Sequence, residues 1–133
     1  MAEANSCCCG GENGLIFACS GASNVGQLAN GVALDLAKNG QGSMSCIAAI
    51  GAHLDGFVVS VRDCDQLIVL DGCERNCALL TFQQVEVDPH VHLTFTEHGL
   101  EKKHGEGTSE AELRRAYDLV IEKMKANACL KNS

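Results

Sequence analysis

Two cysteines follow the most strongly apolar segment of this 133-residue chain. The run Leu67–Leu70 has no polar alternation, which is typical of a strand covered on both faces in a parallel sheet. Asp71, Gly72 and Cys73 come next, and Gly72 can provide the tight turn from which a helix begins. A helix that begins near Cys73 carries Cys73 and Cys77 on one face, because residues four apart lie one above the other. The sequence therefore predicts two soft metal ligands together at a helix N-terminus.

A helix N-terminus suits thiol chemistry. Its free backbone N–H groups and the positive end of the helix dipole favour the thiolate, which is the form that binds metal ions and attacks disulfides. The alternative is that both cysteines are small core residues, since free cysteine is among the most buried residue types. For one cysteine alone, burial is the better interpretation. Two thiols at this spacing, directly after a strand, favour a metal-binding or reactive-thiol site.

Two further cysteines stand in comparable places. The apolar run over 14–18 ends in Cys19, and a helical pattern follows. A weaker apolar run over 43–50 contains Cys46, and helical spacing returns over 54–61. The sequence thus repeats a unit of strand, cysteine-containing turn and helix.

The remaining elements are indicated by their patterns and caps. Ser23 can cap the helix after Cys19, and Gly40 can end it. Val91–Phe95 alternates apolar and polar residues, as expected of a half-exposed edge strand. A charged loop over 97–107 leads to a capping box at Ser109, which opens a final amphipathic helix. These alternations predict a three-layer α/β/α fold with a four-stranded, mostly parallel sheet in the order 2-1-3-4, of the Rossmann-like or flavodoxin-like type.

The predicted topology gathers the separated cysteines. In open parallel sheets, ligands bind beyond the carboxyl ends of the strands, at the switch point between strands one and three. Cys19 and Cys73 fall at that point, Cys46 lies on or just after the neighbouring strand, and Cys77 lies one helical turn beyond Cys73. We therefore expect these thiols at one rim of the sheet.

Length and composition indicate one globular domain. A chain of 133 residues with 46% hydrophobic and 20% charged residues can bury a core without a metal or a cross-link. We predict a domain over 14–128, a flexible cysteine-rich tail over 1–13 and a short tail over 129–133. The triplet Cys7–Cys9 in the first tail is either inert or an auxiliary metal-binding arm.

Charge and hydropathy limit the partners and the location. A net charge of −7 and the lack of a Lys and Arg stripe argue against nucleic acid. No apolar run approaches the ~20 residues of a membrane span, and the N-terminus has no secretion-signal pattern. We therefore predict a cytoplasmic protein whose nine cysteines are reduced and serve metal or redox chemistry. A homo-oligomer is compatible with the sequence, which indicates no particular protein partner.

Three cysteine motifs resemble those of a known family. They are CSGASNVG at 19–26, MSCIAAIG at 44–51 and DGCERNCA at 71–78, with a looser match in EHGLEKK at 97–103. They are similar to the DGC-domain proteins, a family of small prokaryotic zinc-binding proteins named after the tripeptide Asp-Gly-Cys. The resemblance spans about residues 14–103 and implies zinc binding through cysteines, with no known reaction. It gives no role to the triplet Cys7–Cys9, to Cys64 or to Cys129.

Four thiolates suit tetrahedral Zn²⁺, a borderline-soft ion that needs no redox partner. We predict as its ligands Cys19, Cys46, Cys73 and Cys77. The same thiols could instead be split between two ions, completed by other groups or by a second chain. An iron–sulfur cluster takes the same ligands, although the tight CxxC runs of ferredoxin-type sites are lacking. The predicted function is that of a zinc-binding protein that carries or senses the metal.

The second hypothesis is a cytosolic thiol oxidoreductase, with Cys19 or Cys73 as nucleophile and Cys77 or Cys46 as resolving thiol. The three residues between Cys73 and Cys77, where redox motifs have two, count against it. The loop that begins at Cys19 also resembles the thiol loop of low-molecular-weight phosphatases and arsenate reductases, but it lacks the Arg that grips an oxyanion. This loop could still hold an anion or lower the pKa of the Cys19 thiol, and a plain helix cap is the alternative.

Other polar residues are interpreted as structural. The five histidines form no HxxxH pair and are predicted to be surface or packing residues, with the first of them on a helix; they are His53, His90, His92, His98 and His104. Asp71 is a hydrogen-bond acceptor for the turn in preference to a general base. Cys64, between two aspartates, is expected to pack in the core.

Overall fold

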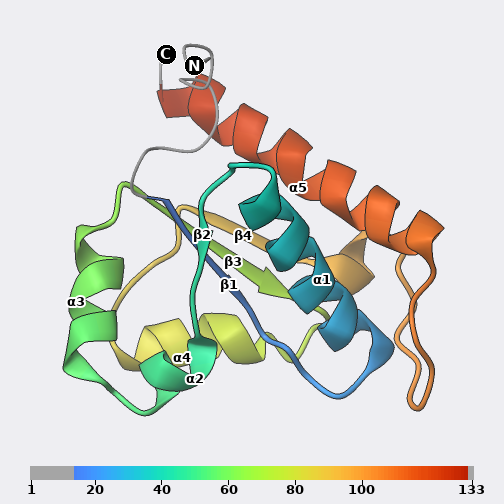
Figure 1. Cartoon of the computed structure of the whole chain (residues 1–133), viewed down its shortest axis with the longest axis horizontal. Helices are drawn as coiled ribbons and strands as arrows, with labels where there is room; N and C mark the ends of the chain where they lie inside the picture. The colour runs from blue at the N-terminus through green and yellow to red at the C-terminus, as the bar shows by residue number, and fades with distance from the viewer. Residues whose placement is uncertain (1–13, 132–133) are drawn as a thin grey trace.

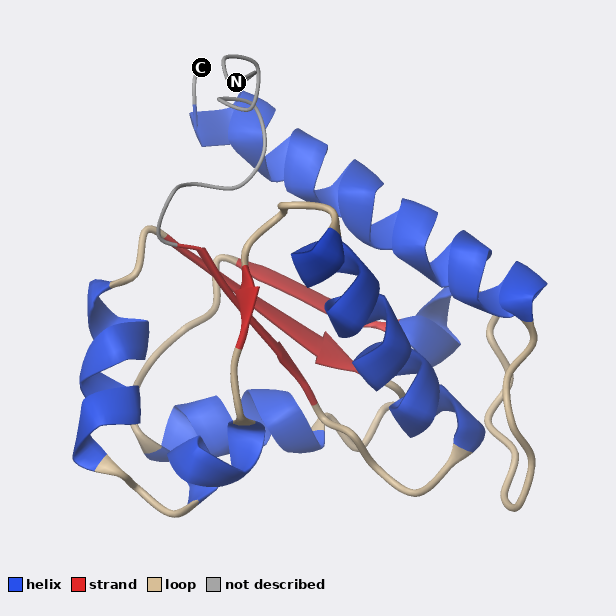
Figure 2. Cartoon of the chain, in the orientation of Figure 1, coloured by secondary structure: helices blue, strands red, loops and turns tan. Residues whose placement is uncertain are grey.

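The computed structural model describes residues 14–131. The predicted tail over 1–13, with Cys7–Cys9, therefore lies outside the described residues. The elements follow one another as β1 (Gly14–Ala18), α1 (Asn24–Lys38), β2 (Ser43–Met44), α2 (Ile47–Gly51), α3 (Asp55–Asp63), β3 (Gln66–Asp71), α4 (Cys77–Gln84), β4 (Val91–Thr94), the 3₁₀ helix η2 (Phe95–His98) and α5 (Glu110–Lys131). Figures 1 and 2 show the resulting layers, with the sheet between two groups of helices.

The sheet has the predicted topology. Its order is β2-β1-β3-β4, and every pairing is parallel. Helices α1 and α5 cover one face, while α2, α3 and α4 cover the other (Figure 1). The predicted α/β fold is therefore confirmed, and β1 and β3 are the two central strands.

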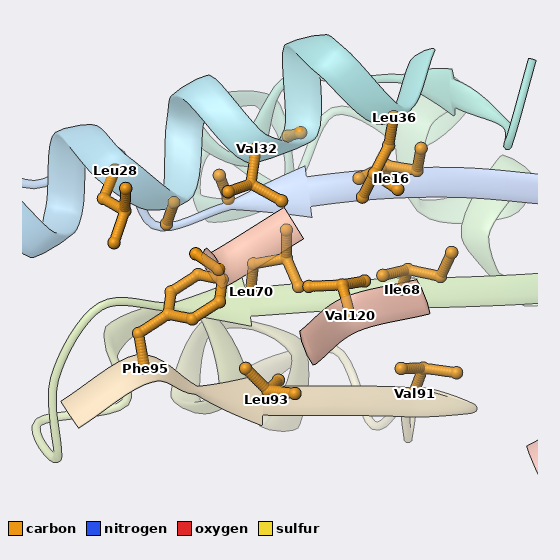
Figure 3. Packing of buried hydrophobic residues seen from close by; sticks show 14 of the residues in the cluster. Ile16, Leu28, Val32, Leu36, Ile68, Leu70, Val91, Leu93, Phe95 and Val120 are labelled. Carbon is orange, nitrogen blue, oxygen red and sulfur yellow. The ribbon is translucent and has the colours of Figure 1, made fainter. Parts of the chain in front are cut away.

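Both faces of the central strands are buried, which explains why their sequences show no polar alternation. Ile16, Ile68 and Leu70 pack under α1 and α5, together with Val91 and Leu93 of β4 and Val120 of α5 (Figure 3). On the other face, Phe17, Leu67 and Val69 pack with Phe82 of α4, whose ring meets that of Phe17 edge-on at a centroid distance of 4.9 Å. The first core fixes α1, and the second fixes α4.

The predicted caps are formed. The backbone N–H of Gly26 donates to Ser23 Oγ at 3.2 Å at the start of α1. At the start of α5, the N–H of Glu112 donates to Ser109 Oγ and the N–H of Ser109 donates to Glu112 Oε1. α5 then continues to Lys131, so Cys129 lies in a helix and not in a tail.

Two boundaries differ from the prediction. The apolar run over 43–50 forms a strand only at Ser43–Met44, and its second half is the short helix α2. The periodicity of a short apolar run does not distinguish a strand from a buried helix, and the alanines in the second half of this run favour the helix. His53 was expected on a helix, but it lies between α2 and α3 with φ at +57°, so that prediction is wrong.

The helix expected from Cys73 begins four residues later. Residues 73–76 form a turn closed by the N–H of Asn76 on the carbonyl of Cys73, at 3.0 Å. Asn76 has φ at +53°, a left-handed conformation that Asn tolerates better than most residues, and α4 begins at Cys77. The prediction that Cys73 and Cys77 share one helical face is therefore wrong.

Candidate functional site

The carboxyl ends of β1 and β3 bring Cys19 against the Asp-Gly-Cys turn. Ala18 pairs with Leu70 in the sheet, and the N–H of Cys19 donates to the carbonyl of Leu70 at 3.0 Å. The N–H of Gly72 in turn donates to Cys19 Sγ at 3.4 Å. Two motifs that stand 53 positions apart in the sequence thus meet at the predicted switch point.

Glycines allow the backbones of these motifs to touch. A Cβ at Gly72 would lie 2.6 Å from the carbonyl group of Val25, and a Cβ at Gly26 would lie 2.7 Å from the backbone of Gly21. Real Cβ atoms do not approach other atoms so closely. Gly72 is therefore required less for a turn conformation than for the approach of α1 to the turn.

Asp71 fixes the start of α4. Its side chain is 1% exposed, and its two carboxylate oxygens accept the N–H groups of Ala78 at 2.8 Å and Leu79 at 3.1 Å. His92 Nε2 lies 2.9 Å from Asp71 Oδ2. The predicted structural role of Asp71 is confirmed, and because Asp71 holds the first turn of α4, it also places Cys77.

His92 was interpreted as a surface or packing residue, and its partnership with Asp71 was missed. β4 pairs with β3 in a register that sets Val69 beside His92 and Asp71 beside Thr94. Alternation along β4 turns His92 to the face opposite Leu93, which is the face of Asp71. The alternation was visible in the sequence, but the register was not.

The turn over 72–76 is tied to the neighbouring strand. Thr94 is 3% exposed, and its Oγ1 donates to Asn76 Oδ1 at 2.7 Å. The N–H of Thr96 donates to the carbonyl of Gly72 at 3.1 Å. These bonds hold both ends of the turn that carries Cys73.

A third segment reaches the turn from the loop before α5. Lys102 Nζ lies 3.4 Å from Cys73 Sγ. Asn24, which is 3% exposed, anchors this loop: its Nδ2 donates to the carbonyl of Glu101 at 2.8 Å, and its Oδ1 accepts the N–H of Lys103. Neither Asn24 nor Lys102 was singled out from the sequence, although each lies in a motif that resembles the family.

Two of the backbone donors at the start of α1 have partners within the fold. The N–H of Asn24 donates to the carbonyl of Lys103 at 3.1 Å, and the N–H of Gly26 donates to Ser23 Oγ. These two groups therefore do not point at a free anion site. Of the two alternatives for this loop, the structure shows the helix cap.

The electrostatics at Cys19 favour its neutral thiol. Burial raises the pKa of Cys19, while hydrogen bonds to the backbone at Gly21 and Gly72 lower it by less. The neighbouring Asp71 and Cys77 raise the pKa further. Of the alternatives left open for this loop, a lowered pKa of the Cys19 thiol is therefore not the one that the structure favours.

The predicted ligands fall into two groups. Cys19, Cys73 and Cys77 lie at the ends of β1 and β3, with the first two half-buried and Cys77 exposed. Cys46 is exposed at the start of α2 and lines a separate groove with Met44. Within residues 14–131, no three side chains of His, Cys, Asp or Glu are arranged so that they could hold a metal ion. The four-thiol ligand set remains a prediction.

Two other cysteines lie outside these two groups. Cys64 is 8% exposed and packs in the core under α4, and its Sγ lies 3.3 Å from the carbonyl of Val61. Its predicted packing role is confirmed. Cys129 is exposed on α5, far along the chain from the three motifs.

Among the described helices, none combines the length and apolar character needed to cross a membrane.

Comparison with known proteins decides the family. The family model of the DGC domain matches residues 15–120. The chain belongs to the DGC-domain family. The match includes the three cysteine motifs and Lys102, and it excludes Cys129. The DGC-domain chain is also similar to the anaerobic and virulence modulator AnvM of Pseudomonas aeruginosa, with 41% identity over 103 residues, which are 77% of this chain and 79% of the relative. No solved structure matches it significantly.

Proposed function

We propose that this DGC-domain protein binds zinc through the thiols at the carboxyl ends of β1 and β3, and that it carries or senses the metal in a regulatory role. The observation that carries the proposal is the meeting of Cys19 with the turn that bears Cys73 and leads into Cys77. The relative AnvM is named as a modulator, which supports a regulatory role.

The donor set fits a soft divalent ion in kind. Cys19 is a half-buried thiol, and burial, with smaller contributions from Asp71 and Cys77, raises its pKa, so a bound cation is what would hold it as a thiolate. Zn²⁺ bound to thiolates would supply a redox-inert centre that fixes the rim of the sheet. Glu74 and Arg75 in the intervening turn are exposed, which leaves this turn room to adjust.

The fourth zinc ligand has more than one candidate source. Cys46 is our first choice, because it follows β2 at the same end of the sheet. A ligand from the segment 1–13 or from a second chain is the alternative. Metal stoichiometry tests whether the thiols serve one site, since two ions per chain would indicate that they are split between sites.

The test is metal analysis of protein purified anaerobically without chelator. We expect about one zinc ion per chain. Cys73→Ser should lower the zinc content steeply, whereas the matched control Cys129→Ser, an exposed cysteine outside the family match, should not change it. A wild-type zinc content near zero, with every thiol open to titration, would refute the proposal.

A thiol oxidoreductase is the second candidate, and one observation favours it. Lys102 Nζ lies 3.4 Å from Cys73 Sγ, and cationic neighbours are typical of reactive cysteines. The test is the alkylation rate of each cysteine in metal-free protein, measured by mass spectrometry across pH. If Cys73 reacts no faster than Cys129 at neutral pH, the activated nucleophile is absent and this candidate fails.

A further inference from the structure

The loop before α5 is held over the thiol rim by one buried side chain. Asn24 binds the residues on both sides of Lys102, through the carbonyl of Glu101 and the N–H of Lys103, and its own N–H donates to the carbonyl of Lys103. We call this three-bond arrangement the Asn24 clasp. It spans nearly 80 positions of sequence, and Asn24 itself is the first residue of α1, close after Cys19.

The clasp fixes the backbone on either side of Lys102 while leaving its side chain free to reach the turn. Lys102 is half-buried, and its ammonium meets Cys73 Sγ at 3.4 Å. Lys103 differs, since its side chain is 47% exposed and lies 3.9 Å from each of the carboxylates of Glu101 and Glu106. Of two adjacent lysines, the structure directs only one to the thiols.

We propose that Lys102 is a positioning residue of the thiol site, which orients Cys73 Sγ and offsets the negative charge of the ligand set. This inference rests on the zinc binding proposed above. Three or four thiolates around a divalent ion leave a net negative charge, and Asp71 adds a buried carboxylate beside them. An ammonium that donates to one sulfur stabilises that charge and restricts the rotation of the cysteine side chain.

The physical consequence is slower loss of the metal. A hydrogen bond to a ligating atom keeps it in the orientation needed for coordination, and removing such an outer partner typically weakens metal binding by about 10–100-fold. Lys102→Met keeps most of the length of the side chain and removes the ammonium. We therefore expect zinc release to be faster by roughly tenfold or more in this variant.

The experiment measures zinc release from the full chain to an excess of a chromogenic chelator by stopped flow. The matched control is Lys103→Met, which we expect to stay within about twofold of wild type because exposed ion pairs contribute little. Lys102→Arg should recover part of the slow release, since it restores a cationic donor. Thermal unfolding of the metal-free variants checks that the fold is unchanged.

A second readout separates positioning from a general effect on the fold. In cobalt-substituted protein, the thiolate-to-metal charge-transfer band should shift in Lys102→Met and not in Lys103→Met. If wild type binds zinc but Lys102→Met matches it in release rate and spectrum, the role of Lys102 is refuted while the zinc site stands. If wild type binds no zinc, the proposed function fails and this inference fails with it.

Discussion

Replacing Asp71 by Asn should destabilise the domain through the first turn of α4. The native carboxylate accepts two backbone N–H groups and faces His92 from a site that is 1% exposed. The amide of Asn keeps one acceptor oxygen and turns an NH₂ group toward a donor, so at least one buried N–H loses its partner. Buried hydrogen bonds to a charged group contribute about 1.5–3 kcal/mol, and the loss of more than one contact gives an expected cost of roughly 2–4 kcal/mol.

Urea unfolding measures this cost. With an m-value of about 2 kcal/mol per molar, the midpoint of Asp71→Asn should fall by roughly 1.5 M. Amide exchange gives the local readout, because the N–H groups of Ala78 and Leu79 should exchange faster. Asp65→Asn is the matched control, since Asp65 is exposed just before β3. A loss in Asp71→Asn below about 0.5 kcal/mol, or unchanged exchange at both amides, would refute the assigned role.

Three further predictions concern the core and the rim. Gly72→Ala should lower the free energy of unfolding by more than about 2 kcal/mol, because its Cβ would lie 2.6 Å from backbone atoms of Val25. Gly56→Ala, which has open space on α3, should leave the free energy of unfolding unchanged or raise it by about 0.5 kcal/mol. Thermal unfolding of the two variants compares these effects. Burial raises the pKa of Cys64 in the folded protein, so its contribution to stability is full below the unfolded pKa of ~8.5 and is lost as pH rises through the folded value. Cys64→Ala should therefore flatten the alkaline fall in the urea midpoint, and an unchanged slope would contradict this. Chelation should speed hydrogen exchange in the segments over 19–24, 46–51 and 71–77 and leave Leu67–Leu70 protected, whereas global loss of protection would show that the metal is needed for folding.

The fold could be predicted because its strongest signals are local. β1 and β3 are apolar on both faces, and Ser23 and Ser109 form the caps that their spacing indicated. β2 was overestimated because SMSCIAAI is equally compatible with a strand and with the helix that its second half forms. Sequence periodicity thus located the layers but not the boundaries in the weakest segment.

The residue at which α4 begins could not be predicted from the neighbouring sequence. A helix from Cys73 needs an acceptor for its first N–H groups near that position, but Asp71 supplies its two oxygens to Ala78 and Leu79 instead. The left-handed conformation of Asn76 is held by Thr94, which is 18 positions away. Both effects depend on the pairing of β3 with β4, so no pattern within the Asp-Gly-Cys segment could have revealed them.

The long-range hydrogen bonds that the local sequence does not reveal also connect the thiols to the surface. The turn that bears Cys73 is bonded to Thr94 and Thr96, and Cys73 itself meets Lys102. A change in ligation at this turn is therefore expected to alter the segment over 92–103, which contains the edge strand β4, η2 and the clasped loop. In the proposed sensing role, this segment is where a partner would detect the metal, because the central strands β1 and β3 are buried on both faces and have no free surface to present.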